Sequence, residues 1–178
     1  PKSLMRSILI LSLVFRAAAV SAQAPQVAPG QPDPGAPASP VPVATAYSQM
    51  VDRLKAGDRT VNFTEFRMAF TETPAYNGMM MGVYRQLWNP LNVRDFEGAL
   101  KVVGAVLQRN YAEPNAHMVA TIAHGQLGHQ SEMQFHRFIA GGLLQSITSQ
   151  GDGKTPETAY VVVDVSEEYA LFRSLNLS

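Results

Sequence analysis

All four histidines of the chain lie in one stretch of twenty residues, HMVATIAHGQLGHQSEMQFH, from His117 to His136. Imidazole is a common ligand of zinc and copper and a common general acid or base, so this stretch is the first candidate for chemistry. His117 and His124 are seven residues apart on one predicted helix, and His129 and His136 repeat that spacing. Seven residues separate two side chains by about 10 Å along a helix. Two ligands on one helix need roughly one turn, so neither helix can hold an ion by itself.

A metal site can still form between the two helices. It would pair His124 with His129 across the turn at Gly128, or His117 with His136 across the hairpin. Zinc would also need a third protein ligand nearby, and the segment contains a single acidic residue, Glu132. We therefore favour two packed helices that carry polar or packing histidines. A metal-dependent enzyme or metal carrier that uses His117, His124, His129 and His136 is the alternative.

The helices that must position the histidines have the clearest hydrophobic periodicity in the chain. Apolar residues at helical spacing predict helices over 95–109, 115–127 and 130–149. Three segments precede them, over 45–57, 63–70 and 76–88. We expect the third of these to end at Asn89-Pro90, because proline interrupts a helix.

An internal offset of 34 residues relates two of these helices. It places Met133 opposite Ala99 and Ala140 opposite Val106. The period is that of the tetratricopeptide repeat, a helix-turn-helix unit. The sequence therefore predicts a mainly α fold of tetratricopeptide-like antiparallel helical hairpins. We expect the groove between such helices to be lined by His117, His124, His136 and Trp88.

The carboxyl-terminal part changes character. Residues 158–165 hold five β-branched residues in eight, which predicts a short strand. Ser166 is a candidate N-cap of a final helix, and Glu167 and Glu168 suit its first turn, where a carboxylate stabilises the helix dipole. No second strand is evident in the chain, so the partner of the predicted strand is not apparent.

The amino-terminal part has the pattern of an exported protein. Lys2 and Arg6 precede the apolar run SILILSLVF and then small residues that end at Ala24, which predicts a signal peptide over residues 1–24 that is cleaved after Ala22 or Ala24. An apolar run this short cannot span a bilayer, which needs about 20 residues, so we expect no membrane span after cleavage. Seven prolines within residues 25–44 predict a disordered linker before a domain at 45–178.

Composition narrows the function further. The chain has no cysteine, so export brings no disulfide framework. Removal of the predicted signal peptide would leave 14 − 3 = 11 basic and 14 acidic residues, a net charge of −3 without a basic cluster, which argues against nucleic-acid binding. No set of catalytic residues converges in the sequence, and no cofactor is expected. The leading hypothesis is a periplasmic or secreted binding module for a protein or peptide of the cell envelope.

Three blocks of the sequence carry a family resemblance: AGDRTVNFTEFRMAFTETPAYN, NYAEPNAHMVATIAHGQLGH and FHRFIAGGLLQSITSQGDGKTPETAYVVVDVSEEY. With them, residues 45–177 resemble the bacterial domain-of-unknown-function 4919 family. The resemblance implies an exported protein with a tetratricopeptide-like helical body and implies no reaction. Family members continue into a further β-rich tail, so the resemblance predicts that this chain is truncated at its C-terminal β-rich end.

Overall fold

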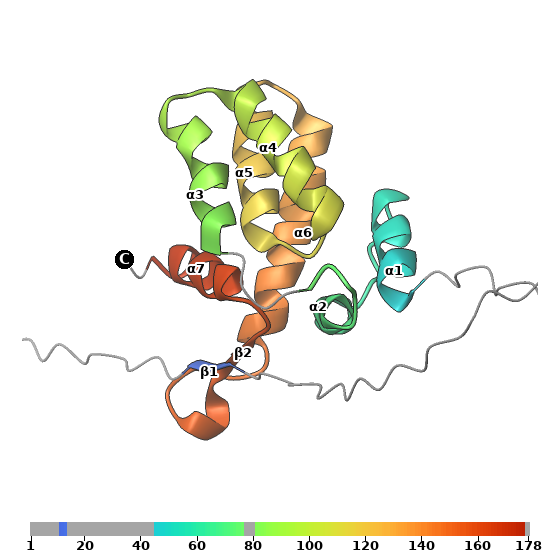
Figure 1. Cartoon of the computed structure of the whole chain (residues 1–178), viewed down its shortest axis with the longest axis vertical. Helices are drawn as coiled ribbons and strands as arrows, with labels where there is room; N and C mark the ends of the chain where they lie inside the picture. The colour runs from blue at the N-terminus through green and yellow to red at the C-terminus, as the bar shows by residue number, and fades with distance from the viewer. Residues whose placement is uncertain (1–10, 14–44, 77–80, 177–178) are drawn as a thin grey trace, which may run out of the picture.

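The computed structural model describes residues 11–13, 45–76 and 81–176, and their arrangement is mainly α-helical, as predicted (Figure 1). The helices are α1 (Ala46–Lys55), α2 (Phe63–Thr71), α3 (Met81–Asn92), α4 (Phe96–Arg109), α5 (Pro114–Gln126), α6 (Gln130–Thr148), the 3₁₀ turn η1 (Pro156–Thr158) and α7 (Val165–Ser174). Most of the predicted signal peptide and the whole predicted linker lie outside the described residues. Their structure stays a prediction.

Helices α3 to α6 lie side by side and are joined by short turns, so that α3–α4 and α5–α6 form successive helical hairpins (Figure 1). The second helices of these two hairpins begin 34 residues apart, at Phe96 and Gln130, which is the predicted offset. Ala99 is fully buried, whereas its counterpart Met133 is half-buried, and its sulfur lies close to Gly125 of α5. At the contact between α5 and α6 the small residue is therefore Gly125 of α5, and α6 carries the larger Met133.

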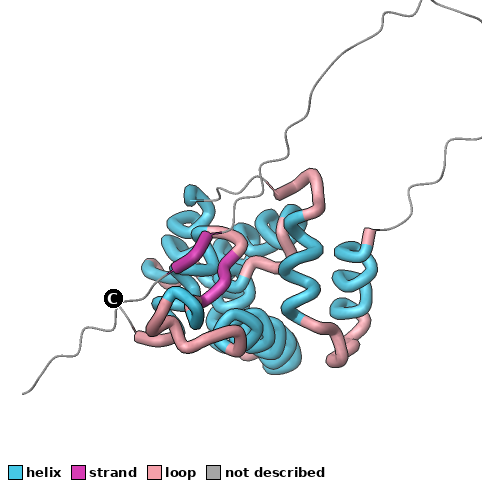
Figure 2. The backbone as a smooth tube through the Cα atoms, turned by 90° about the horizontal axis from the view of Figure 1, so that it is seen from below, coloured by secondary structure: helices cyan, strands magenta, loops and turns pink. Residues whose placement is uncertain are grey.

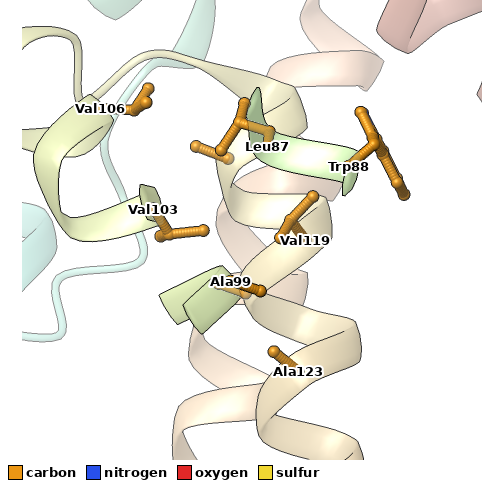
Figure 3. Packing of buried hydrophobic residues seen from close by; sticks show 9 residues of the cluster. Leu87, Trp88, Ala99, Val103, Val106, Val119 and Ala123 are labelled. Carbon is orange, nitrogen blue, oxygen red and sulfur yellow. The ribbon is translucent and has the colours of Figure 1, made fainter. Parts of the chain in front are cut away.

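The largest apolar cluster joins α3, α4 and α5 (Figure 3). Its buried members are Leu87, Trp88, Ala99, Val103, Val106, Ala116, Val119, Ala120 and Ala123. Three of the four α5 members are alanines, and Ala99 is the small residue on α4, so the two helix backbones can approach closely. This cluster holds α5 in place, and α5 carries His117 and His124.

A second cluster attaches α1 and α2 to α6. Its fully buried members include Phe66 and Phe70 of α2 together with Ile139 and Leu143 of α6. The ring of Tyr47 in α1 stacks on Phe66 with 5.2 Å between centroids. Leu107 of α4 packs against both clusters, so they are in contact at the C-terminal end of α4.

Side-chain caps explain where most of the helices begin. Helices α1, α2, α4, α5 and α7 each begin at an N-cap residue whose side chain accepts a hydrogen bond from the backbone of the first turn. In that order, the N-caps are Thr45, Asn62, Asp95, Glu113 and Asp164. Helix α6 differs, because its N-cap His129 makes no side-chain capping bond. The imidazole of His129 is directed to another histidine instead.

The structure corrects three predicted boundaries. Helix α3 continues through Pro90 to Asn92, because proline this close to the end of a helix removes a single helical hydrogen bond. The predicted strand over 158–165 shortens to β2 (Tyr160–Val162) between η1 and α7. The N-cap of α7 is Asp164 rather than Ser166, which lies in the first turn of the helix.

A short strand, β1 (Leu11–Leu13), pairs in parallel with β2 (Figure 2). The register places Leu11 opposite Tyr160 and Leu13 opposite Val162. The partner that was not evident from sequence lies within the predicted signal peptide. None of the helices in the described part of the chain is long and apolar enough to cross a bilayer.

Candidate functional site

An open groove of about 790 Å³ lies between α2 and α6. One wall is the segment that leads into α2 together with its first turn, and the other is the exposed face of α6. The lining residues are Arg59, Val61, Asn62, Phe63, Thr64, Gln134, Arg137, Phe138, Gly141, Gly142, Gln145, Ser146 and Ser149. Amides, hydroxyls and two guanidinium groups surround two aromatic rings, which is the mixture found in binding sites that orient a partly apolar ligand.

Two adjacent glycines in α6 shape the groove in different ways. A Cβ on Gly142 would overlap the ring of Phe63, so glycine is required there for α2 to pack on α6. A Cβ on Gly141 would meet nothing within 4 Å, because that position faces the open groove. Phe63 in turn packs edge-on against Phe138, with 5.6 Å between centroids.

The two glycines provide a matched pair of variants. We expect Gly142→Ala to lower the free energy of unfolding by about 1–3 kcal/mol, because Phe63 must leave its packed position. Gly141→Ala should raise the free energy of unfolding by up to about 1 kcal/mol, since alanine favours a helix and its methyl group meets open space. Urea denaturation of both variants measures the difference, and equal effects would contradict the assigned packing.

The charges that line the groove have one sign. Arg59 and Arg137 are its charged lining residues, and no Asp or Glu in the described ranges lines it. The guanidinium carbon of Arg59 lies over the ring of Phe138 at 4.8 Å from the centroid. This cation–π contact orients Arg59 without neutralising it, so the groove keeps its positive character.

A buried ion pair fixes α2, and with it one wall of the groove. Arg67 donates from Nε and Nη2 to the two carboxylate oxygens of Glu167 in α7, at 2.6 Å each. Its Nη1 donates to the hydroxyl of Ser146, a groove residue, and its Nη2 also donates to the Val161 carbonyl at 2.9 Å. The backbone N–H of Val163 donates to Glu167, so the carboxylate is satisfied on both oxygens. Glu167 therefore lies in the first turn of α7, as predicted, and also forms a buried ion pair with Arg67.

The histidines form both of the cross-helix pairs that were considered from sequence. Nδ1 of His117 lies 2.9 Å from Nδ1 of His136, and Nδ1 of His124 lies 3.2 Å from Nδ1 of His129. The rings of His124 and His136 are nearly parallel, with 5.5 Å between centroids. The four rings thus make a continuous row along the α5–α6 hairpin, from the buried His117 to the exposed His129.

Hydrogen bonding fixes the roles in the inner pair. The Tyr111 carbonyl, 2.9 Å from Nε2 of His117, can only accept, so His117 donates there. Nδ1 of a neutral His117 must then accept, and His136 donates to it. Burial lowers the pKa of His117 and of His136, and repulsion from the neighbouring imidazolium lowers each pKa further. The inner pair is therefore held neutral, with its facing nitrogens already engaged.

None of the four residues predicted to line a binding groove is among the residues that line the groove between α2 and α6. His117 is fully buried and Trp88 is 8 % exposed within the first cluster, with the guanidinium of Arg173 lying 3.8 Å from the centre of the Trp88 ring. His124 and His136 are half-buried in the histidine row, and neither of them lines the groove. Among the described residues, no group of three or more His, Cys, Asp or Glu side chains could hold a metal ion.

One feature of the sequence could have indicated the groove residues that sequence reasoning missed. The pair Gly141-Gly142 lies in the middle of α6, where glycine lowers the stability of the helix. Glycine in such a position indicates that close packing requires it. A buried position for Arg67 could also have been inferred, because Arg67 falls on the apolar stripe formed by Phe63, Phe66 and Phe70. A charge in that position must be buried with a partner or directed away from the core.

One family model, described as Domain of unknown function (DUF4919), matches residues 43–178. Comparisons with curated proteins and with solved structures give no match.

Proposed function

Because the chain belongs to the DUF4919 family, whose description assigns no reaction, we propose a function from the groove itself: a binding module for an extended, acidic peptide segment of another protein. The observation that carries this proposal is the pairing of two guanidinium groups with aromatic and amide side chains, in a groove where no described carboxylate lies. Arginine binds carboxylates through two parallel hydrogen bonds, and Gln134 and Gln145 suit the amides of a peptide backbone.

The position of Gly141 favours a peptide over a compact small molecule. Glycine leaves the surface of α6 without a side chain at the centre of the groove, which lets a backbone approach the helix closely. The groove is open along its length, and an extended chain can lie in it with alternate side chains directed to Arg59 and Arg137.

The cell compartment belongs to the same proposal. The basic, apolar and small-residue order of residues 1–24 supports export, and the proline-rich residues 25–44 support a spacer that would give the groove reach. We place the partner among the proteins of the periplasm or the exterior of the cell.

Selection from a random peptide library tests this function. We expect the selected peptides to be enriched in Asp and Glu and to bind the wild-type chain in fluorescence polarisation. Arg137→Ala should weaken their binding about 10-fold or more, because a charge-assisted hydrogen bond contributes about 1.5–3 kcal/mol. Gly141→Leu should also weaken binding, because its side chain would occupy the groove.

Arg85→Ala is the matched control, since Arg85 is exposed on α3 and is not a groove residue. It removes the same charge from the protein and should leave affinity within about twofold, apart from a small general electrostatic effect. Selected peptides without acidic residues, or peptides that bind the Arg137→Ala and Gly141→Leu variants as tightly as wild type, would overturn the proposal.

A further inference from the structure

The outer histidine pair, His124 and His129, holds two imidazoles close together at the turn between α5 and α6. Neither the groove nor the packing of the hairpin requires this arrangement. His124 lies in the last turn of α5, and His129 is the N-cap of α6. The backbone N–H of His129 donates to the His124 carbonyl at 2.9 Å, and Gly128 adopts the positive φ of +78° that the tight turn needs. The backbone of the turn therefore holds these two residues close together independently of any contact between the rings.

From this geometry we infer that His124 and His129 form a two-histidine binding site for a divalent transition-metal ion, with zinc as the reference ion. Their Nδ1 atoms are 3.2 Å apart. Two imidazole nitrogens bound to one tetrahedral zinc at 2.0–2.1 Å lie about 3.3 Å from each other. Binding of the ion would require the proton between the two nitrogens to move to Nε2 of its own imidazole, and both rings to turn until their Nδ1 lone pairs converge on the ion.

The surroundings favour a cation at this position. The carboxylates of Glu97 in α4 and Glu132 in α6 are near enough to act electrostatically on His124. His129 is exposed, so an ion can reach the pair from solvent. Among N and O ligand sets, imidazole suits zinc, copper and nickel, and it distinguishes this site from one for calcium or magnesium.

The inner part of the histidine row supports the orientation of the outer pair. His136 stacks on His124, and His136 is held by His117, whose other nitrogen donates to the Tyr111 carbonyl. Hydrogen-bonded support of this kind limits ring rotation, as it does behind histidines that bind metals. The inner pair does not itself offer a site, because His117 is fully buried and its Nε2 donates to the Tyr111 carbonyl, so its proton cannot move there to free Nδ1.

The uncapped start of α6 is a second observation that points to this use of His129. An N-cap side chain normally accepts a hydrogen bond from the first turn, and Asn, Asp or Ser would do so here better than histidine. His129 makes no such bond, and its ring is directed to His124. Histidine at position 129 therefore leaves the start of α6 less stable than a capping residue would, but it places a second imidazole beside His124.

With two protein ligands, the remaining coordination positions of the ion stay open. No third His, Cys, Asp or Glu in the described part of the chain completes a closed site, so the ion would be held by water or by a side chain of another molecule. The class of site is therefore exchangeable, of the kind that carries an ion or bridges two proteins, and it is unlike the four-ligand sites that hold a fold together.

Calorimetric titration of the untagged full chain with zinc chloride tests the inference. We expect one zinc per chain, and X-ray absorption at the zinc edge should show two imidazole ligands. His129→Asn should weaken zinc binding by more than about 10-fold. The same substitution should raise the melting temperature, because asparagine is a strong N-cap, so lost binding could not be attributed to unfolding.

His124→Gln should weaken zinc binding to a similar extent, whereas Gln130→Ala, at an exposed neighbouring position, should leave it unchanged. The inference fails if zinc does not bind the wild-type chain, if His129→Asn binds zinc as tightly as wild type, or if the absorption spectrum shows no imidazole ligand. These outcomes are independent of peptide binding in the groove, which involves none of these histidines.

Discussion

Replacing Arg67 by methionine is expected to lower the free energy of unfolding by about 3–5 kcal/mol, because it leaves the Glu167 carboxylate buried without its partner. The side chains of both residues are almost completely buried, and the two hydrogen bonds between them are each 2.6 Å long. Removal of Arg67 also leaves the Val161 carbonyl without this donor. Urea denaturation followed by circular dichroism measures the loss.

Two further variants separate the pair from its surroundings. Arg67→Met combined with Glu167→Leu should recover most of the stability, since a buried ion pair replaced by apolar side chains is often neutral or stabilising. Arg53→Met breaks the exposed pair with Asp58 and should have a far smaller effect. A double variant as unstable as the single one would show that Arg67 acts through Ser146 and Val161 rather than through Glu167.

The Arg67–Glu167 pair also shows where sequence reasoning stops. Helical periodicity predicts which residues of α2 face the interior, because it depends on contacts within one helix. It cannot name the partner of a buried charge that lies 100 residues away. The position of Arg67 on an apolar stripe indicates that a partner exists, and the two acidic residues at the start of α7 were interpreted from sequence as contributions to the helix dipole alone.

The histidines illustrate the opposite case. Once two helices are joined by a short turn, their facing residues are determined by counting from that turn. The cross-helix pairs could therefore be proposed from sequence, and the structure forms both of them. The groove between α2 and α6 could not be placed in this way, because three other helices separate α2 from α6 in the chain.

Glu113 and the inner histidine pair give stability opposite dependences on pH. Burial raises the pKa of Glu113, the N-cap of α5, from 4.5 to about 7, so the native state retains a proton there that the unfolded state loses. Stability should therefore fall as pH rises from about 4.5 to 7. The inner histidine pair behaves in the reverse sense, because the pKa of each member is lowered from 6.5 in the native state. Its contribution is lost as pH falls below about 6.5.

Between pH 7 and pH 4 the first contribution, from Glu113, is expected to reach about 3 kcal/mol, and the second about 3 kcal/mol for each of the two histidines. The histidine pair therefore outweighs Glu113, and the stability of the wild-type chain should fall as pH drops over this range. Variants separate them. Glu113→Gln removes the first contribution, so its stability should fall steeply, relative to wild type, as pH drops from 7 to 4. His117→Gln with His136→Gln removes the second, so that variant should gain relative stability over the same range. Urea denaturation at pH 7, 5.5 and 4 measures both slopes. Parallel profiles for all three proteins would show that neither Glu113 nor the histidine pair titrates with the pKa its burial imposes.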